Sequence, residues 1–379
     1  MDIKTDSGGH GPRFPLAVVL SLAIAPLLAF GPLQISRGPR QAAATANVVS
    51  AANAFLATLS DSERTTCTFD FKSDQRTGWS NLPTGIFQRH GLRFGDMTLR
   101  QREAALALVA SALSREGYQK VTNIMNGDEV LKNAGGGRTG GRQGAAGPPG
   151  RGAPNAPGGR GGPGAPGGVR FGLDEYYVAL LGTPSATAPW MIQFGGHHLA
   201  INVTLVGPSN VMTPSLPAAQ PAKYTLNGQT IRPLGRENDK AFELINALNA
   251  DQRKQAILNY QITDLVLGPG ADGKVIQPEG IQVSRMNTSQ QALLLDLAHE
   301  WVGILNDGAA GAKMTEIESN LPRTYFAWSG STKNGELAYY RIQGPTLIIE
   351  YAPQQGDLDH IHTIYRDPTN DYGARLVQP

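Results

Sequence analysis

The chain carries an internal repeat. Three short segments recur 189 residues later: 59–64 as 248–253, 91–92 as 280–281, and 97–101 as 286–290. Chance supplies one such match easily but hardly three at a single offset, and a fixed offset is typical of internal duplication. We therefore predict two copies of one unit, the first in residues 47–133 and 171–238 and the second in residues 239–379.

A Gly/Pro/Arg-rich tract interrupts the first copy. Residues 177–182 resemble 325–330 at an offset of 148 rather than 189, a difference of 41 residues that is close to the length of the tract over 134–170. The tract has almost no large apolar side chain, so it cannot bury enough surface to offset the entropy of ordering. We predict a disordered insertion.

Each copy repeats the same pattern of helices and strands. Helices over 48–59 and 239–248 precede a second helical stretch, a Gly-containing loop and a long amphipathic helix over 98–116 or 288–305. The predicted strands are 175–181, 190–193 and 199–205 in the first copy, and 324–328, 338–343 and 346–351 in the second. The pattern predicts an α+β protein whose halves pair their strands into one antiparallel sheet, with helices packed on one side.

The N-terminal segment has the features of an export signal. Residues 14–35 carry no charge, Lys4 and Arg13 precede them, and the small-x-small pattern at 44–46 is typical of a cleavage site. We interpret residues 1–46 as a leader and expect a periplasmic or secreted protein. An uncleaved anchor over residues 14–35 and a buried N-terminal helix are the alternatives.

Charge and cysteine content exclude several classes. The net charge is +2, and the five arginines of the tract at 134–170, which has no acid, leave about −3 for the rest. A mildly acidic folded part argues against a nucleic-acid partner, and a membrane is expected only through an uncleaved anchor. A single cysteine, Cys67, excludes an intrachain disulfide and is more typical of packing than of catalysis.

Four of the seven histidines lie in two stretches that resemble strands, 195–198 and 359–362. Alternate residues of a strand share a face, so His360 and His362 project together about 6–7 Å apart. This spacing suits two imidazoles on one metal ion. Of the adjacent His197 and His198 only one can face the same site, and we choose His198 as the third ligand. The alternative is a set of polar residues on solvated strands.

The histidines also mark where the copies diverge. Aligning 192–193 with 342–343 gives the first hairpin two additional loop residues, together with both of its histidines, and only the second copy continues through 360–373. We expect function where duplicated units differ, which predicts a site at the seam between the halves.

Charged residues on the neighbouring strands complete the candidate site. Glu350 is a candidate fourth ligand or general base, and Arg341 and Arg366 are candidates to orient a small-molecule substrate. The alternative is that these residues only form ion pairs with one another. Glu350 would then pair with Arg341 or Arg366, and the two arginines would pair with Glu350 and Asp367. Asp359 or Asp367 could orient an imidazole from outside the ligand set. Such ligands suit a divalent transition metal, Zn, Fe, Mn or Cu.

Several of these segments resemble one bacterial family. The matching stretches are 194–202, 232–237, 339–345, 349–351, 360–368 and 370–373. In this combination the chain resembles domain of unknown function 3500 over most of residues 47–379, although the insertion is not a feature we associate with that family. The resemblance implies an often exported protein without an assigned reaction.

The residues thus favour an exported metal-dependent enzyme, a hydrolase or an oxidoreductase, acting on a small anionic or polar substrate. Two alternatives stay open. One is a non-catalytic periplasmic protein that binds a ligand or metal without turnover. The other is a structural duplicate whose histidines only form hydrogen bonds to hairpin loops.

Overall fold

The computed structural model describes residues 37–135 and 168–377. Residues 1–36 of the predicted leader and 136–167 of the predicted insertion lie outside this range, so those two predictions stay open. Before the gap the elements are α1 (Arg37–Leu56), α2 (Asp61–Cys67), β1 (Thr68–Phe69), β2 (Leu92–Arg93), α3 (Leu99–Ala112) and α4 (Arg115–Asn133).

The chain after the gap supplies the remaining strands and helices. Seven strands come first: β3 (Tyr177–Leu181), β4 (Trp190–Gly196), β5 (Leu199–Val206), β6 (Ser209–Val211), β7 (Leu216–Pro217), β8 (Tyr224–Leu226) and β9 (Gln229–Ile231). The second half follows with α5 (Gly235–Ala247), α6 (Ala250–Ala256), β10 (Ile281–Gln282), α7 (Thr288–Val302), α8 (Asp307–Asn320), β11 (Tyr325–Gly330), β12 (Ala338–Gly344), β13 (Leu347–Pro353) and β14 (Ile361–Arg366). The mixed α+β class is confirmed.

The strands form two main sheets instead of the single antiparallel sheet that we predicted. The first has the order β1-β3-β4-β5-β6, with β2 on β3 and β7 on β5, and its β1–β3 pair is parallel. The second is antiparallel with the order β10-β11-β12-β13-β14. A connecting segment, residues 213–222, joins them, because it pairs with β5 through β7 and with β14 through Ser215 and Ala219. Ser215 and Tyr365 exchange two backbone hydrogen bonds, of 2.9 and 2.8 Å.

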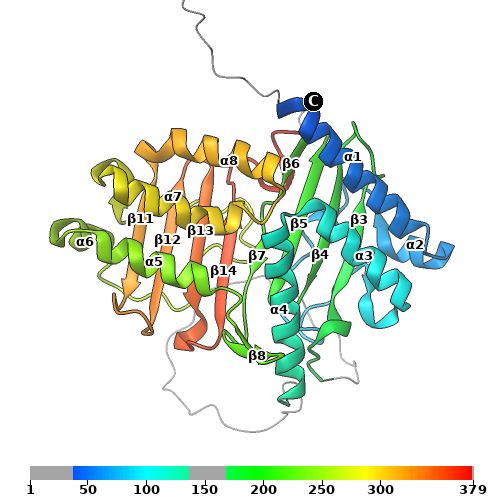
Figure 1. Ribbon diagram of the computed structural model, residues 1–379, viewed down its shortest axis with the longest axis horizontal. Helices are drawn as coiled ribbons and strands as arrows, with labels where there is room; N and C mark the ends of the chain where they lie inside the picture. Colours follow the sequence, from blue (N-terminus) through cyan, green and yellow to red (C-terminus); the bar gives the residue numbers. More distant parts are fainter. Residues whose placement is uncertain (1–36, 136–167, 378–379) are drawn as a thin grey trace, which may run out of the picture. The chain divides into compact units, whose positions relative to one another are not determined.

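Helices and loops cover opposite faces of these sheets. Figure 1 looks onto the helices with the strands behind them. One large apolar cluster fills the helix side and includes Phe55, Leu108, Trp190, Leu297, Trp301 and Tyr340. A smaller cluster on the other face contains Trp79, Leu216 and Ile364, with Leu265 packed against it. Loops therefore line the face on which His362 lies.

A capping residue interrupts the first long predicted helix, and the second, predicted over 288–305, is α7, which ends at Val302. The helix predicted over 98–116 ends at Ala112 and a new one starts after Ser114, whose side chain accepts a hydrogen bond from the Gly117 amide. In the second half Asn306 caps α8 in the same way. A side-chain acceptor at such a position ends the periodic pattern and starts a helix in another direction.

Several local contacts recur at the 189-residue offset. Gln101 Nε2 donates to the Thr58 carbonyl at 3.2 Å, and Gln290 Nε2 donates to the Ala247 carbonyl at 2.8 Å. Gly91 and Gly280 both have positive φ, 110° and 88°. A Cβ at either position would lie within 2.6 Å of a strand carbonyl, so glycine is required twice for the same reason.

The hairpin turns correct one prediction. His197 and His198 form the turn between β4 and β5, where Gly196 pairs with Leu199, and the turn between β12 and β13 is equally short because Gly344 pairs with Leu347. The hairpin of β4 and β5 therefore has no additional loop residues. The error arose because an Ile-Gln pair stands two positions earlier in β4 than in β12, which misled the alignment.

Candidate metal centre

Three imidazoles meet at the seam between the two halves. His198 comes from the turn between β4 and β5, and His360 and His362 come from the start of β14. His198 Nε2 lies 2.7 Å from His360 Nε2, which lies 3.1 Å from His362 Nε2. One ligand nitrogen from each of the three residues lies within 4.8 Å of the other two. The predicted convergence is confirmed.

These distances are compatible with one shared ion. Two nitrogens that each bind Zn²⁺ at about 2.0–2.1 Å in a tetrahedral arrangement lie about 3.4 Å apart. The separations of 2.7 and 3.1 Å are somewhat shorter than this value. The three residues could therefore hold a metal ion, whose identity the geometry leaves open.

A left-handed backbone conformation aims His198 at the site. Its φ is +61°, a conformation that costs a non-glycine residue about 1–2 kcal/mol. Two backbone hydrogen bonds hold it: the His198 amide donates to the Asn81 carbonyl at 3.1 Å, and the His198 carbonyl accepts from the Ala218 amide at 2.8 Å. Loop and connecting segment thus fix the imidazole from both sides.

Asp264 orients His362. His362 lies opposite Ala352 in the sheet, and its Nδ1 is 3.0 Å from Asp264 Oδ1. A carboxylate there favours the proton on Nδ1 and leaves the Nε2 lone pair for a metal. Burial raises the pKa of Asp264, but the interactions with His362 and the hydrogen bonds from Leu265 and Gln354 together hold that pKa below its ordinary value. Asn81 Nδ2 lies 3.2 Å from His362 Nε2 and contacts the same site.

Burial keeps His198 and His360 in the neutral form that binds metals. Burial first, and the neighbouring imidazoles second, place the pKa of His198 well below 6.5. The same causes lower the pKa of His360 to about 4. His198 Nδ1 is buried and has no hydrogen-bond partner among the described residues. An unsatisfied group of this kind costs about 1–3 kcal/mol, which a bond from Nε2 to a metal could offset.

His197 supports the site from behind. Its Nδ1 lies 2.6 Å from Asp128 Oδ1 on α4, and its ring centroid is 3.6 Å from that of His198. Burial lowers the pKa of His197 despite the attraction of Asp128. Of the adjacent pair, His198 is thus the one that joins His360 and His362, whereas His197 is held by Asp128 of α4.

The structure does not bring Glu350 to the three histidines. Its carboxylate accepts hydrogen bonds from the Val266 and Leu267 amides at 3.2 and 2.8 Å, and from the Tyr339 hydroxyl. Burial raises the pKa of Glu350. A carboxylate whose oxygens anchor a loop is not free to bind a metal, so the expectation of a fourth ligand or base at this residue is replaced by an anchoring role.

Arg341 and Arg366 are both engaged by carboxylates. Arg341 Nη2 lies 2.7 Å from Glu279, and Arg366 contacts Asp272 and, through Nε at 3.0 Å, Asp371. Both arginines are at least 97% buried. These contacts favour ion pairing over a substrate clamp, although the partners are not the Glu350 and Asp367 that we named.

Two residues of the site, Asn81 and Asp264, were not predicted from the sequence. They lie in irregular segments without periodicity, so no local pattern indicated them. Of the two aspartates that we expected to orient an imidazole, Asp359 accepts from the Ala222 amide at 2.9 Å and Asp367 contacts Lys313. Neither prediction was correct, because each carboxylate is used to hold backbone or a lysine.

A family model described as a protein of unknown function (DUF3500) matches residues 41–374. The chain belongs to the DUF3500 family. The match includes every residue of the DUF3500 site described above. No curated protein and no solved structure matches the chain. Within the described part of this DUF3500 chain, no helix has the length and apolar character needed to cross a bilayer.

Proposed function

We propose that this DUF3500 protein is an exported metal-dependent enzyme in which His198, His360 and His362 hold a divalent transition metal. The observation that carries the proposal is the convergence of three Nε2 atoms, with a carboxylate behind His362. Side chains that only decorate a solvated strand have no reason to meet in this way.

The ligand set favours catalysis over a purely structural ion. Three neutral imidazoles leave the charge of the metal uncompensated and leave at least one coordination position for water or substrate. Such an ion lowers the pKa of its water to about 7 and polarises a bound carbonyl or phosphoryl oxygen. With zinc the site suits a hydrolase, and with iron or copper an oxidoreductase.

The site can be approached from the loop-covered face. The Asp264 side chain is 43% exposed and His360 is half-buried, whereas His198 and His362 are buried. An ion that only stabilises the fold is normally enclosed by four protein ligands. Partial exposure at two of these residues favours a site that a small polar substrate can reach.

One observation favours a second candidate, a non-catalytic protein that binds a metal or ligand. Glu350 anchors a loop, and Arg341 and Arg366 are paired. None of the three residues that we expected to act as base or substrate clamp is free to do so. Turnover would then depend on the metal and its water alone.

We also infer export and internal duplication. The uncharged stretch at 14–35 supports export, and cleavage after residue 46 would remove the first part of α1, so an uncleaved leader is the form we favour. Recurring contacts at Gln101 and Gln290, and at Gly91 and Gly280, support duplicated helix–hairpin units.

Metal analysis of protein purified from its native compartment tests the proposal. We expect about one transition-metal ion per chain in the wild type and at least tenfold less in His198→Ala and His362→Ala. His299→Ala is the matched control, because His299 is an exposed residue of α7. A wild-type protein free of metal would refute the proposal, and a metal-loaded protein that turns over no ester, amide, phosphoester or redox substrate would favour the second candidate.

A further inference from the structure

A cavity lies on the same seam as the three histidines, at the other end of β14. Its volume is about 320 Å³, at the small end of the roughly 300–1,000 Å³ range of ligand sites. The wall includes β6 and the two residues after it, α8, and the segment that follows β14. β14 starts beside the three histidines and ends at this cavity, where Tyr365 and Asp367 line it.

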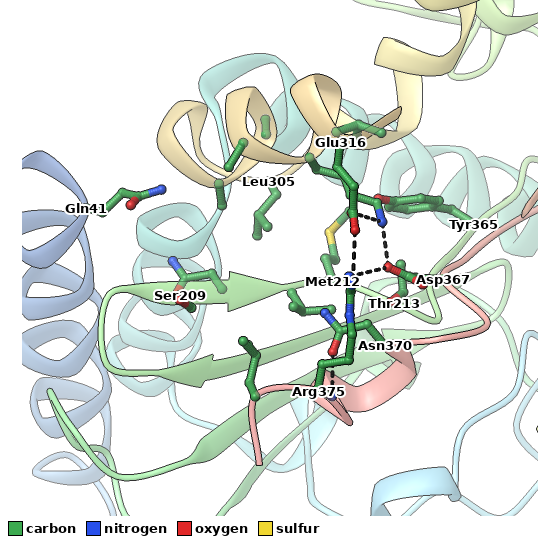
Figure 2. A pocket seen from close by; sticks show the side chains of 18 residues that line it. Gln41, Ser209, Met212, Thr213, Leu305, Glu316, Tyr365, Asp367, Asn370 and Arg375 are labelled. Atoms are coloured by element: carbon green, nitrogen blue, oxygen red, sulfur yellow. Dashed lines mark hydrogen bonds and ion pairs between the residues drawn. The ribbon is translucent and has the colours of Figure 1, made fainter. Parts of the chain in front are cut away.

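The cavity has an apolar side and an ionic side. Figure 2 shows Leu305 on one side and Glu316, Asp367 and Arg375 joined by dashed lines on the other, with Met212 between them in this view. Ala309 of α8 extends the apolar side. A ligand that fills this space therefore needs an apolar body.

The ionic side is neutral as a whole. Lys313 Nζ contacts Glu316 at 2.8 Å and Asp367 at 2.5 Å. Arg375 contacts the same two carboxylates at 2.9 and 3.2 Å. Two cations and two anions thus satisfy one another. A charged ligand would have to displace one of these partners, so the wall favours a neutral ligand.

Two polar groups of the wall are suited to a hydroxyl or amide. Asn210 Oδ1 is buried and has no hydrogen-bond partner among the described residues, so it needs a donor. Burial raises the pKa of Tyr365 well above 10, so its hydroxyl stays protonated and can donate. A ligand hydroxyl or amide can thus donate to Asn210 or accept from Tyr365.

We propose that this cavity binds a neutral amphipathic small molecule, with an apolar body against Leu305, Ala309 and Met212 and a hydroxyl or amide group directed to Asn210. The occupant would connect α8, β6 and the segment after β14. Binding does not involve the three histidines, so this site is independent of the proposed metal function.

A fluorescent neutral alcohol, 2-naphthol, is a suitable probe, and its anionic analogue 2-naphthoate is the charge control. With the full chain at neutral pH we expect saturable binding of one 2-naphthol, at least tenfold tighter than that of 2-naphthoate, and a rise in the unfolding temperature with probe concentration. Labelled methionine methyl groups should report the site through Met212. Equal or tighter binding of the anion, or no saturable binding, would overturn the proposal.

Substitutions locate the bound probe. Ala309→Trp fills the cavity and should abolish binding, whereas Thr315→Trp adds the same side chain to an exposed position of the same helix and should not. Asn210→Leu is a milder change at a half-buried residue and should weaken binding at least fivefold. His360→Ala should leave binding unchanged. Equal binding by wild type, Ala309→Trp and Asn210→Leu would place the probe elsewhere and contradict the proposal.

Discussion

His362 Nδ1 lies 3.0 Å from Asp264 Oδ1, although 98 residues separate the two in the chain. This contact fixes which ring nitrogen of His362 faces His360. Without it both tautomers of His362 would be accessible and the lone pair would face the site only part of the time. The loop that carries Asp264 is therefore part of the candidate metal centre.

Removing this carboxylate should weaken metal binding. We expect Asp264→Asn to lower the metal affinity about 10–100-fold, because an amide does not hold the Nδ1 proton as strongly. Competition with a chelator of known affinity measures the change. Asp359→Asn is the control, since Asp359 lies beside His360 but contacts the Ala222 amide. Unchanged affinity in Asp264→Asn would show that Asp264 does not act on the metal site.

Glu350→Gln should separate stability from metal binding. The carboxylate of Glu350 accepts two backbone amides of the loop at Val266 and Leu267. An amide side chain offers only one oxygen, so we expect a loss of about 1–3 kcal/mol in the free energy of unfolding. The metal content should not change. Loss of metal with normal stability would restore Glu350 as a ligand.

Asp371 should give the protein a pH-dependent stability. Burial raises the pKa of Asp371 to about 6 from an ordinary value near 3.8. The folded state thus holds this proton more tightly than the unfolded state. Its contribution to stability is present below about pH 3.8 and is lost as the pH rises to about 6.

Urea unfolding at several pH values measures this effect. As the pH rises from 4 to 6, the unfolding free energy of the wild type should fall relative to that of Asp371→Asn by on the order of 1–3 kcal/mol. Taking a difference cancels most other titrating groups. If this difference in unfolding free energy does not change between pH 4 and 6, the pKa of Asp371 is not raised in the folded state.

Gly280, which corresponds to Gly91 at the 189-residue offset, should be intolerant of substitution. A Cβ at Gly280 would lie 2.1 Å from the Phe326 carbonyl oxygen, whereas Gly273 has open space around it and a similarly positive φ. We expect Gly280→Ala to destabilise the fold by several kcal/mol and Gly273→Ala by only about 1 kcal/mol. Thermal unfolding of both variants provides the comparison. Similar losses would mean that strain in φ, and not the clash, dominates.

Local sequence patterns were sufficient for the mixed α+β class and for part of the site. A repeat at fixed offset predicted equivalent helices and hairpins in both halves, and the period of two along a strand placed His360 and His362 on one face. These inferences use only neighbouring residues, whose relative positions the backbone geometry fixes.

Tertiary structure decided what lies opposite those residues. His198 contacts His360 although 162 residues separate the two in the chain. His198 lies in a turn and has a left-handed backbone conformation, which no sequence pattern predicted. Asp264 reaches His362 from an irregular loop, and the same loop takes up the carboxylate of Glu350. Contacts of this kind depend on how loops pack over a finished sheet, and the free energy that selects one packing comes from many distant side chains at once.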